Sequence, residues 1–160
     1  MRLTFGPKNI IQIDDARIIY RNFSGAASKF NREGDRNFAV VIDDEEIKDA
    51  LVNDGWNVKV KAPRDDEETP FMYLPVKVKF SDYGPKVYLN AGGPKPVMLS
   101  EDTIDCLDNI DILNVNLDLR PFDWEVNGRT GRTAYLQVID VEQRIDRFAA
   151  RYNQDDNLPF

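Results

Sequence analysis

Apolar and polar residues alternate over short stretches along most of the chain, which is the period of a β-strand with one buried face. One face of the predicted strand Ile112–Arg120 carries four apolar residues: Leu113, Val115, Leu117 and Leu119. The same criteria predict further strands, rich in β-branched and aromatic residues, over Ala16–Phe23, Asn37–Ile42, Trp56–Ala62, Phe71–Phe80, Val87–Gly93 and Ala134–Gln143. Pro75 predicts that its strand is an edge strand or contains a bulge, because proline has no N–H for the ladder.

Three short segments have the pattern of helices. In "DDEEIKDALVNDGW", Asp43 or Asp44 can cap a helix whose first turn is acidic, and Gly55 ends it. Two further helices are predicted over Ser100–Ile110, with Ser100 as N-cap, and over Arg144–Tyr152. The glycine-containing stretch "DWEVNGRTGRT" is predicted to be a turn region.

Many short strands with two or three short helices predict a mainly β, OB-fold-like barrel, five-stranded or extended. A β-sandwich is the alternative. The chain has 160 residues, of which 42% are hydrophobic and 31% charged, and these values are typical of one globular domain. No apolar run is long enough to span a membrane, and the first residues lack a secretory signal, so we expect a cytoplasmic protein. Cys106 is the single cysteine, which excludes an intrachain disulfide.

The composition excludes several kinds of chemistry. The chain has no histidine, so Ser-His-Asp and Cys-His triads and histidine-ligated zinc are excluded. It has 28 Asp and Glu residues, but no spacing singles out a catalytic pair. The runs Asp43–Glu46 and Asp65–Glu68 are interpreted as solvated surface, with a carboxylate metal site as the weaker alternative. We therefore predict no catalytic residue, no metal site and no cofactor, and a protein that is not an enzyme.

Basic residues cluster with aromatic residues, although the formal net charge is −7. A groove for a single nucleic-acid strand needs cations along the phosphates and exposed rings that stack on bases. Loops with both kinds of residue match the ligand loops of OB-folds. The predicted nucleic-acid-binding residues are Arg21, Lys29, Phe30, Arg32, Arg36, Lys59, Lys61, Lys77, Lys79, Arg120, Phe122, Trp124, Arg129 and Arg132.

A purely structural interpretation stands beside this one. Aromatic residues in strands usually belong to the core, and we expect this of Phe38, Phe71 and Phe80. Alternating lysines such as Lys77 and Lys79 also occur on the solvent face of a half-buried sheet, where they prevent edges from pairing.

The chain ends in "NQDDNLPF", an acidic stretch with a hydrophobic tip. This stretch resembles the C-terminal tip of single-stranded-DNA-binding proteins, whose tails carry several acids and end in Ile-Pro-Phe or a close variant. The matching residues are Asp155, Asp156, Leu158, Pro159 and Phe160. The resemblance implies a binding domain over residues 1–152 and a tail, 153–160, that binds replication and recombination enzymes. A partner pocket with an apolar floor and a basic rim can hold the terminal ring and carboxylate together.

The body resembles the phage and prophage type of these proteins in "RIIYRNF", "FNREGDRNFAVVI" and "LDLRPFDWEVNGRTGRTAYL". The resemblance implies single-stranded DNA binding with little sequence preference during phage DNA replication or recombination, in the host cytoplasm. The chain lacks the long Gly/Gln/Pro-rich linker of the bacterial type, which favours the compact, often dimeric phage type. Its long alternating strands have more apolar positions than one small barrel needs, so we hypothesise a symmetric homodimer.

Two other classes fit parts of the sequence. An acidic DNA mimic or inhibitor that binds a host protein would suit the negative charge, but it would not need Arg and Trp gathered in one loop. A carboxylate-and-metal enzyme is the other alternative.

Overall fold

The computed structural model describes residues 1–62, 70–146 and 148. The predicted tail, 153–160, lies outside this part of the chain, as does most of the predicted helix Arg144–Tyr152. Residues 144–146 and 148 of that helix are described and are not helical. The elements, in chain order, are β1 (Arg2–Phe5), η1 (Pro7–Asn9), β2 (Ile11–Ala16), β3 (Ile18–Asn22), β4 (Arg36–Ile42), α1 (Glu45–Asn53), β5 (Lys59–Lys61), β6 (Phe71–Val78), β7 (Lys86–Asn90), β8 (Val97–Leu99), η2 (Ile104–Asp108), β9 (Ile112–Val126) and β10 (Arg129–Gln143).

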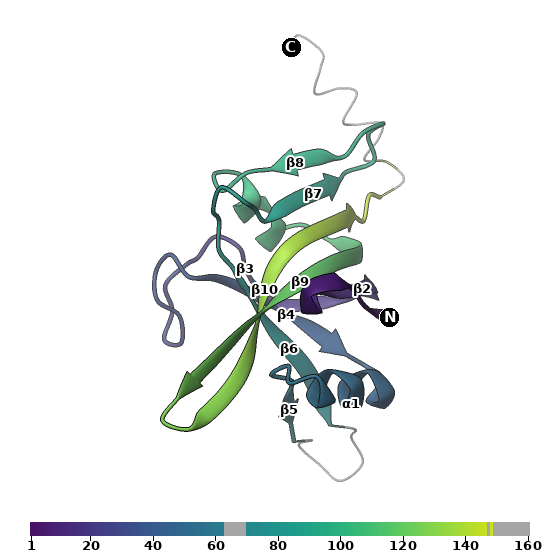
Figure 1. Ribbon diagram of the computed structural model, residues 1–160. Coiled ribbons are helices and arrows are strands. Elements are labelled where there is room, and N and C mark those ends of the chain that lie inside the picture. Colours follow the sequence, from purple (N-terminus) through teal and green to yellow (C-terminus); the bar gives the residue numbers. More distant parts are fainter. Residues whose placement is uncertain (63–69, 147, 149–160) are drawn as a thin grey trace.

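The strands form one curled, mixed sheet with the order β1-β2-β9-β10-β6-β4-β3 (Figure 1). Most neighbours are antiparallel, but β10 runs parallel to β6 and, further along, parallel to β7. Strand β5 adds to β6, and β8 adds to β7. The prediction of a mainly β, OB-like fold is confirmed. Strands β1, β2 and β8 were not predicted as separate elements.

The hairpin of β9 and β10 is the largest element of the sheet. Its ladder pairs Ile112 with Gln143 at one end and Val126 with Arg129 at the other. The stretch predicted as a turn region is therefore mostly strand, and the turn itself is Asn127-Gly128, where both residues have positive φ. An Asn-Gly pair is the preferred sequence for this kind of two-residue turn. The outer half of the hairpin projects away from the rest of the sheet (Figure 1).

Helix α1 begins as its sequence predicts. The Asp44 side chain accepts hydrogen bonds from the backbone N–H groups of Glu46 and Ile47, so Asp44 rather than Asp43 is the N-cap. The second predicted helix is a short 3₁₀ helix, η2, with Thr103 rather than Ser100 at the N-cap. Its apolar residues Ile104 and Leu107 are fully buried.

Pro75 lies in neither of the positions that we expected. Strand β6 is central, and Pro75 pairs with Ala39 of β4 on one side. On the other side, β5 pairs with residues 71–73 and β10 pairs with residues 76–77. The proline therefore falls where β6 changes partner, so its missing N–H interrupts neither of these two ladders.

The core lies inside the curled sheet. Phe38 is buried, as predicted, and stacks on Phe23 with 5.1 Å between ring centroids. Phe80 is partly buried and packs against the core. The placement of Phe71 in the core was wrong, because Phe71 alternates with the buried Met72 and lies on the outer face. No helix in the described residues is long and apolar enough to cross a membrane.

Candidate nucleic-acid interface

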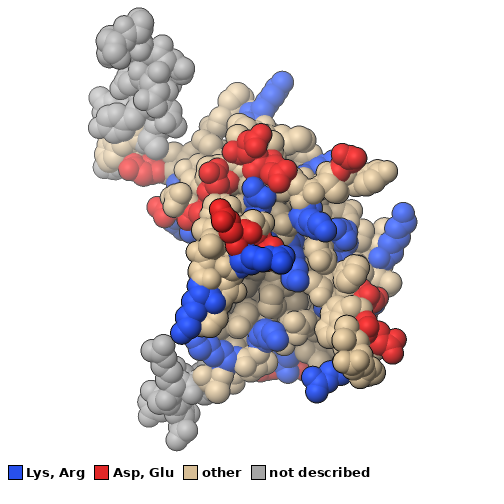
Figure 2. All heavy atoms as spheres, turned by 90° about the vertical axis from the view of Figure 1, so that its left-hand side faces the viewer, with Lys and Arg blue, Asp and Glu red and all other residues tan. Residues whose placement is uncertain are grey.

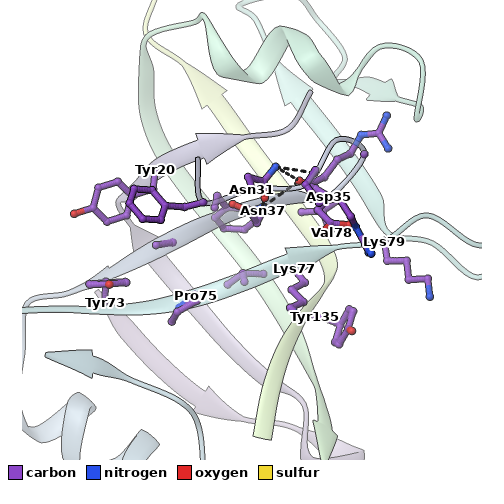
Figure 3. Close-up of a pocket in the computed structure, with 17 residues that line it drawn as sticks. Tyr20, Asn31, Asp35, Asn37, Tyr73, Pro75, Lys77, Val78, Lys79 and Tyr135 are labelled. Atoms are coloured by element: carbon purple, nitrogen blue, oxygen red, sulfur yellow. Dashed lines mark hydrogen bonds and ion pairs between the residues drawn. The ribbon is translucent and has the colours of Figure 1, made fainter. Parts of the chain in front are cut away.

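A groove of about 700 Å³ crosses the outer face of β4 and β6, and β10 contributes Tyr135 at one end (Figure 3). The segment between β3 and β4 forms one wall of it. Tyr20 and Tyr73 lie at one end of the groove, and Lys77, Lys79 and Tyr135 lie towards the other. The groove opens to solvent, which suits a chain-like ligand.

The period of two in β6 builds the floor of the groove. Met72, Leu74, Val76 and Val78 point into the core, so the intervening residues point outwards. Strand β5 adds two lysines to this face, because Lys59 pairs with Tyr73 and Lys61 with Phe71, and paired residues share a face. Two of the predicted basic clusters, on β5 and β6, are thus on one surface.

The rings on this surface form two groups. In the first, Tyr73 contacts Tyr20 and Phe71, with ring centroids 5.5 Å and 5.8 Å away. In the second, Phe122 meets Tyr135 edge-on, with centroids 5.9 Å apart. Tyr20 is 57% exposed and adopts a positive φ of 53°, an unusual conformation for a residue that is not glycine.

The segment between β3 and β4 carries Phe30, whose side chain is 91% exposed and lies under the Lys29 ammonium group. Asn31 holds the segment in shape, since its side-chain amide donates to the carbonyls of Ala26, Arg32 and Asp35. The Phe30 ring is therefore available for stacking on a base.

The outer half of the β9–β10 hairpin continues the groove face. The Arg120 guanidinium lies 4.8 Å from the Tyr135 ring centroid. Phe122 and Trp124 follow Arg120 on the same face of β9, two and four residues further along, and both are exposed. Arg129, opposite Val126, completes this face near the tip. We call these rings the aromatic track; its members are Tyr20, Phe30, Phe71, Tyr73, Tyr135, Phe122 and Trp124.

Charges are unevenly distributed over the side of the molecule that is on the left in Figure 1. Figure 2 shows Lys and Arg side chains across the middle and lower part of this side, while Asp and Glu gather mainly in its upper part and along one edge. Both the segment between β3 and β4 and the outer half of the hairpin project towards this side (Figure 1). The net charge of −7 therefore conceals a locally basic surface.

Four of the predicted arginines form hydrogen bonds or ion pairs within the protein, and one of them, Arg32, does so only through an exposed pair with Asp35 at 3.5 Å. Arg21 donates to the carbonyls of Leu107 and Ile110 and so fastens η2. Arg36 lines the groove, but it donates to the Phe23 carbonyl and pairs with Glu101 at 3.3 Å. Arg132 pairs with Asp123 and Asp54.

The remaining predicted residues divide between the groove and its extension. Phe30, Arg32, Lys77 and Lys79 line the groove directly. Lys29, Lys59, Lys61, Arg120, Phe122, Trp124 and Arg129 lie beside it or on the hairpin. The sequence interpretation missed Tyr20, Tyr73 and Tyr135. For Tyr73 a signal was present, because it shares the strand and the period of Lys77 and Lys79.

The pKa shifts at this surface come from the pairs already described. Hydrogen bonding to Arg132 lowers the pKa of Asp123, and the same bond raises the pKa of Arg132. Both groups stay charged at neutral pH. No cluster of three or more potential metal ligands occurs within residues 1–62, 70–146 and 148.

Comparison with known proteins also points to single-stranded DNA binding in the family of this chain. The sequence model of a family described as "Putative phage ssDNA-binding domain" matches residues 3–159. No curated protein matches the chain. Among solved structures, the single-stranded DNA-binding protein from bacteriophage Enc34 is similar, with a TM-score of 0.59, 11% identity, and coverage of 91% of this chain and 87% of that one.

Two other structures of the Enc34 protein are similar to this chain. The C-terminal truncation gives a TM-score of 0.54 at 12% identity, with coverage of 86% of this chain and 87% of that one. The structure in complex with ssDNA gives a TM-score of 0.52 at 11% identity, with coverage of 91% of this chain and 93% of that one. At these identities the structural likeness concerns the fold.

Proposed function

The chain belongs to the family of the phage ssDNA-binding domain, and from this premise we propose that it binds single-stranded DNA along the aromatic track. The observation that carries the proposal is the row of exposed or half-buried rings, flanked by cations, on one face from Phe71 on β6 to Trp124 near the hairpin tip. Each base stacked on a ring stabilises the complex by about 1–3 kcal/mol. Stacking accepts every base, so little sequence preference is expected.

The spacing of the rings favours an unstacked strand. Successive positions on one face of a strand are two residues apart, or about 6.8 Å. Tyr135, Phe122 and Trp124 lie on successive rungs of this face of the hairpin. Successive bases of one strand of a stacked duplex rise by only about 3.4 Å along the helix axis. A stretched single strand fits this ladder of rings, whereas a duplex keeps its bases stacked and out of reach.

The phosphates would be met by the exposed cations that flank the rings. In the groove these are Lys77 and Lys79, beside it Lys59 and Lys61, and on the hairpin Arg120 and Arg129. Lys29 and Arg32 would contribute from the segment that carries Phe30. Affinity should fall with salt, because bound cations release counterions from the DNA.

The biological setting follows from the same family. The protein would cover single strands during phage DNA replication or recombination in the host cytoplasm, without catalysing a reaction itself. Residues 1–152 would be the binding domain. Asp155, Asp156, Leu158, Pro159 and Phe160 would recruit partner enzymes, by the resemblance of "NQDDNLPF" to partner-binding tips. A homodimer remains our proposal for the assembled state.

A fluorescence titration tests the function. Intrinsic Trp emission is followed while oligo-dT, or a duplex of equal length, is added at two salt concentrations. We expect saturable binding of oligo-dT, tighter at low salt, and weaker binding of the duplex. An absence of oligo-dT binding at low salt would reject the function and would favour the acidic inhibitor of a host protein.

A further inference from the structure

We propose that Arg132 is a positioning residue that docks the outer half of the β9–β10 hairpin onto the end of helix α1, and so holds Phe122 and Trp124 in line with the groove. The inference deepens the proposed function and rests on it. It differs from the sequence-based expectation for this residue, in which Arg132 would touch DNA.

All three nitrogen atoms of the Arg132 guanidinium group donate hydrogen bonds to carboxylates. Its Nε and Nη2 donate to the two carboxylate oxygens of Asp123, at 2.7 Å and 3.1 Å. Its Nη1 donates to Oδ2 of Asp54 at 3.2 Å. Asp123 is the cross-strand neighbour of Arg132, whereas Asp54 is 78 residues away in the sequence. One side chain thus joins the hairpin to a separate element.

Asp54, which binds Arg132 at the end of α1, is itself held by a core residue. Asp54 is the C-cap of α1, and the Oδ2 atom that meets Arg132 also accepts from the Trp56 indole at 2.9 Å. Trp56 is only 3% exposed and belongs to the core. The Arg132 guanidinium lies 5.5 Å from the Trp56 ring, a favourable cation–π distance.

The Arg132 side chain lies on the opposite face of the hairpin from the aromatic track, so it does not face a DNA strand bound there. Side chains alternate along β10, so Arg132 points to the opposite face from Gly131, which pairs with Trp124. The Arg132 side chain is 16% exposed, and its donors face acids. The backbone forms an isolated bridge between Trp56 and Arg132, and among the described residues the Arg132–Asp54 pair is the side-chain hydrogen bond that reinforces this contact.

Neutralising Asp54 and Asp123 distinguishes two possible roles of these acids. If they only repel DNA by their charge, their loss should raise affinity, and if they hold the hairpin through Arg132, their loss should lower it. The double variant Asp54→Asn/Asp123→Asn removes negative charge near a polyanion, so without a clamp oligo-dT should bind more tightly. If the contacts of Arg132 with the two acids act as a clamp that holds the hairpin, the variant releases the hairpin. Affinity for oligo-dT should then fall about 5- to 150-fold, the value of one lost stack. Glu125→Gln is the matched control, since Glu125 has no hydrogen bond or ion pair within the described residues. It should bind as well as the wild type or slightly better.

Variants of Arg132 separate positioning from phosphate contact. Arg132→Gln should weaken oligo-dT binding but leave the salt slope unchanged, and the loss should not add to that of Trp124→Ala. Arg129→Gln should instead lower the slope by about 0.7. Arg132→Lys should fail to restore affinity, because an ammonium group cannot span both carboxylates. A lower slope for Arg132→Gln, or full rescue by Arg132→Lys, would overturn the proposal.

A measurement without DNA keeps this inference separate from the proposed function. Hydrogen exchange of the amides of residues 122–133 should become faster in Arg132→Gln, while exchange in β6 stays as in the wild type. Unchanged exchange in the hairpin would refute the clamp even if the wild type binds DNA. If Arg132→Gln fails to fold, Asp123→Asn answers the same question, since Asp123 lies on the surface.

Discussion

The two halves of the β9–β10 hairpin have the same alternating pattern but opposite surroundings. In the inner half, Val115, Leu117 and Leu119 are at most 3% exposed. In the outer half, Phe122 is 52% exposed and Trp124 is 39% exposed, on a ribbon that projects from the sheet (Figure 1). The inner half stabilises the fold by burial, whereas the outer half leaves large rings in water. Exposed rings beside cations are the groups on which the bases of a single strand can stack.

A core variant of the inner half should give the largest effect. Leu119→Ala removes a fully buried side chain, and the free energy of unfolding should fall by about 2–5 kcal/mol. Urea denaturation measures this loss. Phe122→Ala, three residues further along the strand, is the control and should change stability far less. Equal losses in both variants would remove the distinction between the two halves.

A variant of the outer half should affect binding instead of stability. Trp124→Ala should weaken oligo-dT binding by about 1–3 kcal/mol if the indole stacks on a base. Its thermal unfolding should stay close to that of the wild type, since the ring is partly exposed. Fluorescence anisotropy of labelled oligo-dT measures the change. Unaltered affinity would exclude Trp124 from the interface.

Gly131 sharpens the comparison, because it is the cross-strand partner of Trp124. A Cβ atom at Gly131 would overlap the indole, so Gly131→Ala must displace the ring. We expect a loss of oligo-dT affinity that is no larger than that of Trp124→Ala. Thr130→Ala, on the opposite face, should bind normally. A Gly131→Ala variant with full affinity would show that the position of the ring is unimportant.

The lysines of the groove should have smaller individual effects. Lys77→Gln and Lys79→Gln should each lower the slope of log affinity against log salt by about 0.7 if they meet phosphates. Titrations at several salt concentrations measure the slope. Replacement of Lys95, which lies outside the groove, should leave it unchanged. An unchanged slope for the groove variants would assign these lysines to the solvent face only.

The smallest expected effect concerns Asp118 in the inner half. Burial, and secondly Asp14, raise the pKa of this carboxyl, so its ionised form is disfavoured in the folded state. Asp118 therefore supports folding below its unfolded pKa, and this contribution is lost as pH rises through the folded pKa. Asp118→Asn should raise the melting temperature at pH 7 but not at pH 3. Asp123→Asn should lower it at pH 7, because Asp123 has a lowered pKa.

Much of the fold could be predicted from local patterns. The period of two in β6 and β9, the apolar run of β4 and the acidic first turn of α1 are local features, and the structure contains these elements. The outer half of the hairpin was predicted to be a turn region because it contains Asn127-Gly128 and Gly131. Its strand character comes from cross-strand pairing, such as Trp124 over Gly131, which no single segment contains.

The candidate site was predictable only in part. The basic clusters were visible in the sequence, but whether an arginine is free depends on partners far away, as for Arg21 with η2 and Arg132 with Asp54. Tyr20 and Tyr135 lie on different strands, and the folded sheet brings both to one groove (Figure 3). Ring contacts of this kind follow from sheet order, which local periodicity does not determine.

Photo-crosslinking tests the central claim most directly. Oligonucleotides that contain 5-iodouracil are bound to the wild-type protein at low salt and irradiated, and the crosslinked residues are identified by mass spectrometry. We predict crosslinks to Tyr73, Tyr135, Phe122 and Trp124 on the aromatic track. Crosslinks confined to Phe5 on β1 and Tyr88 on β7, which lie outside the track, would contradict it.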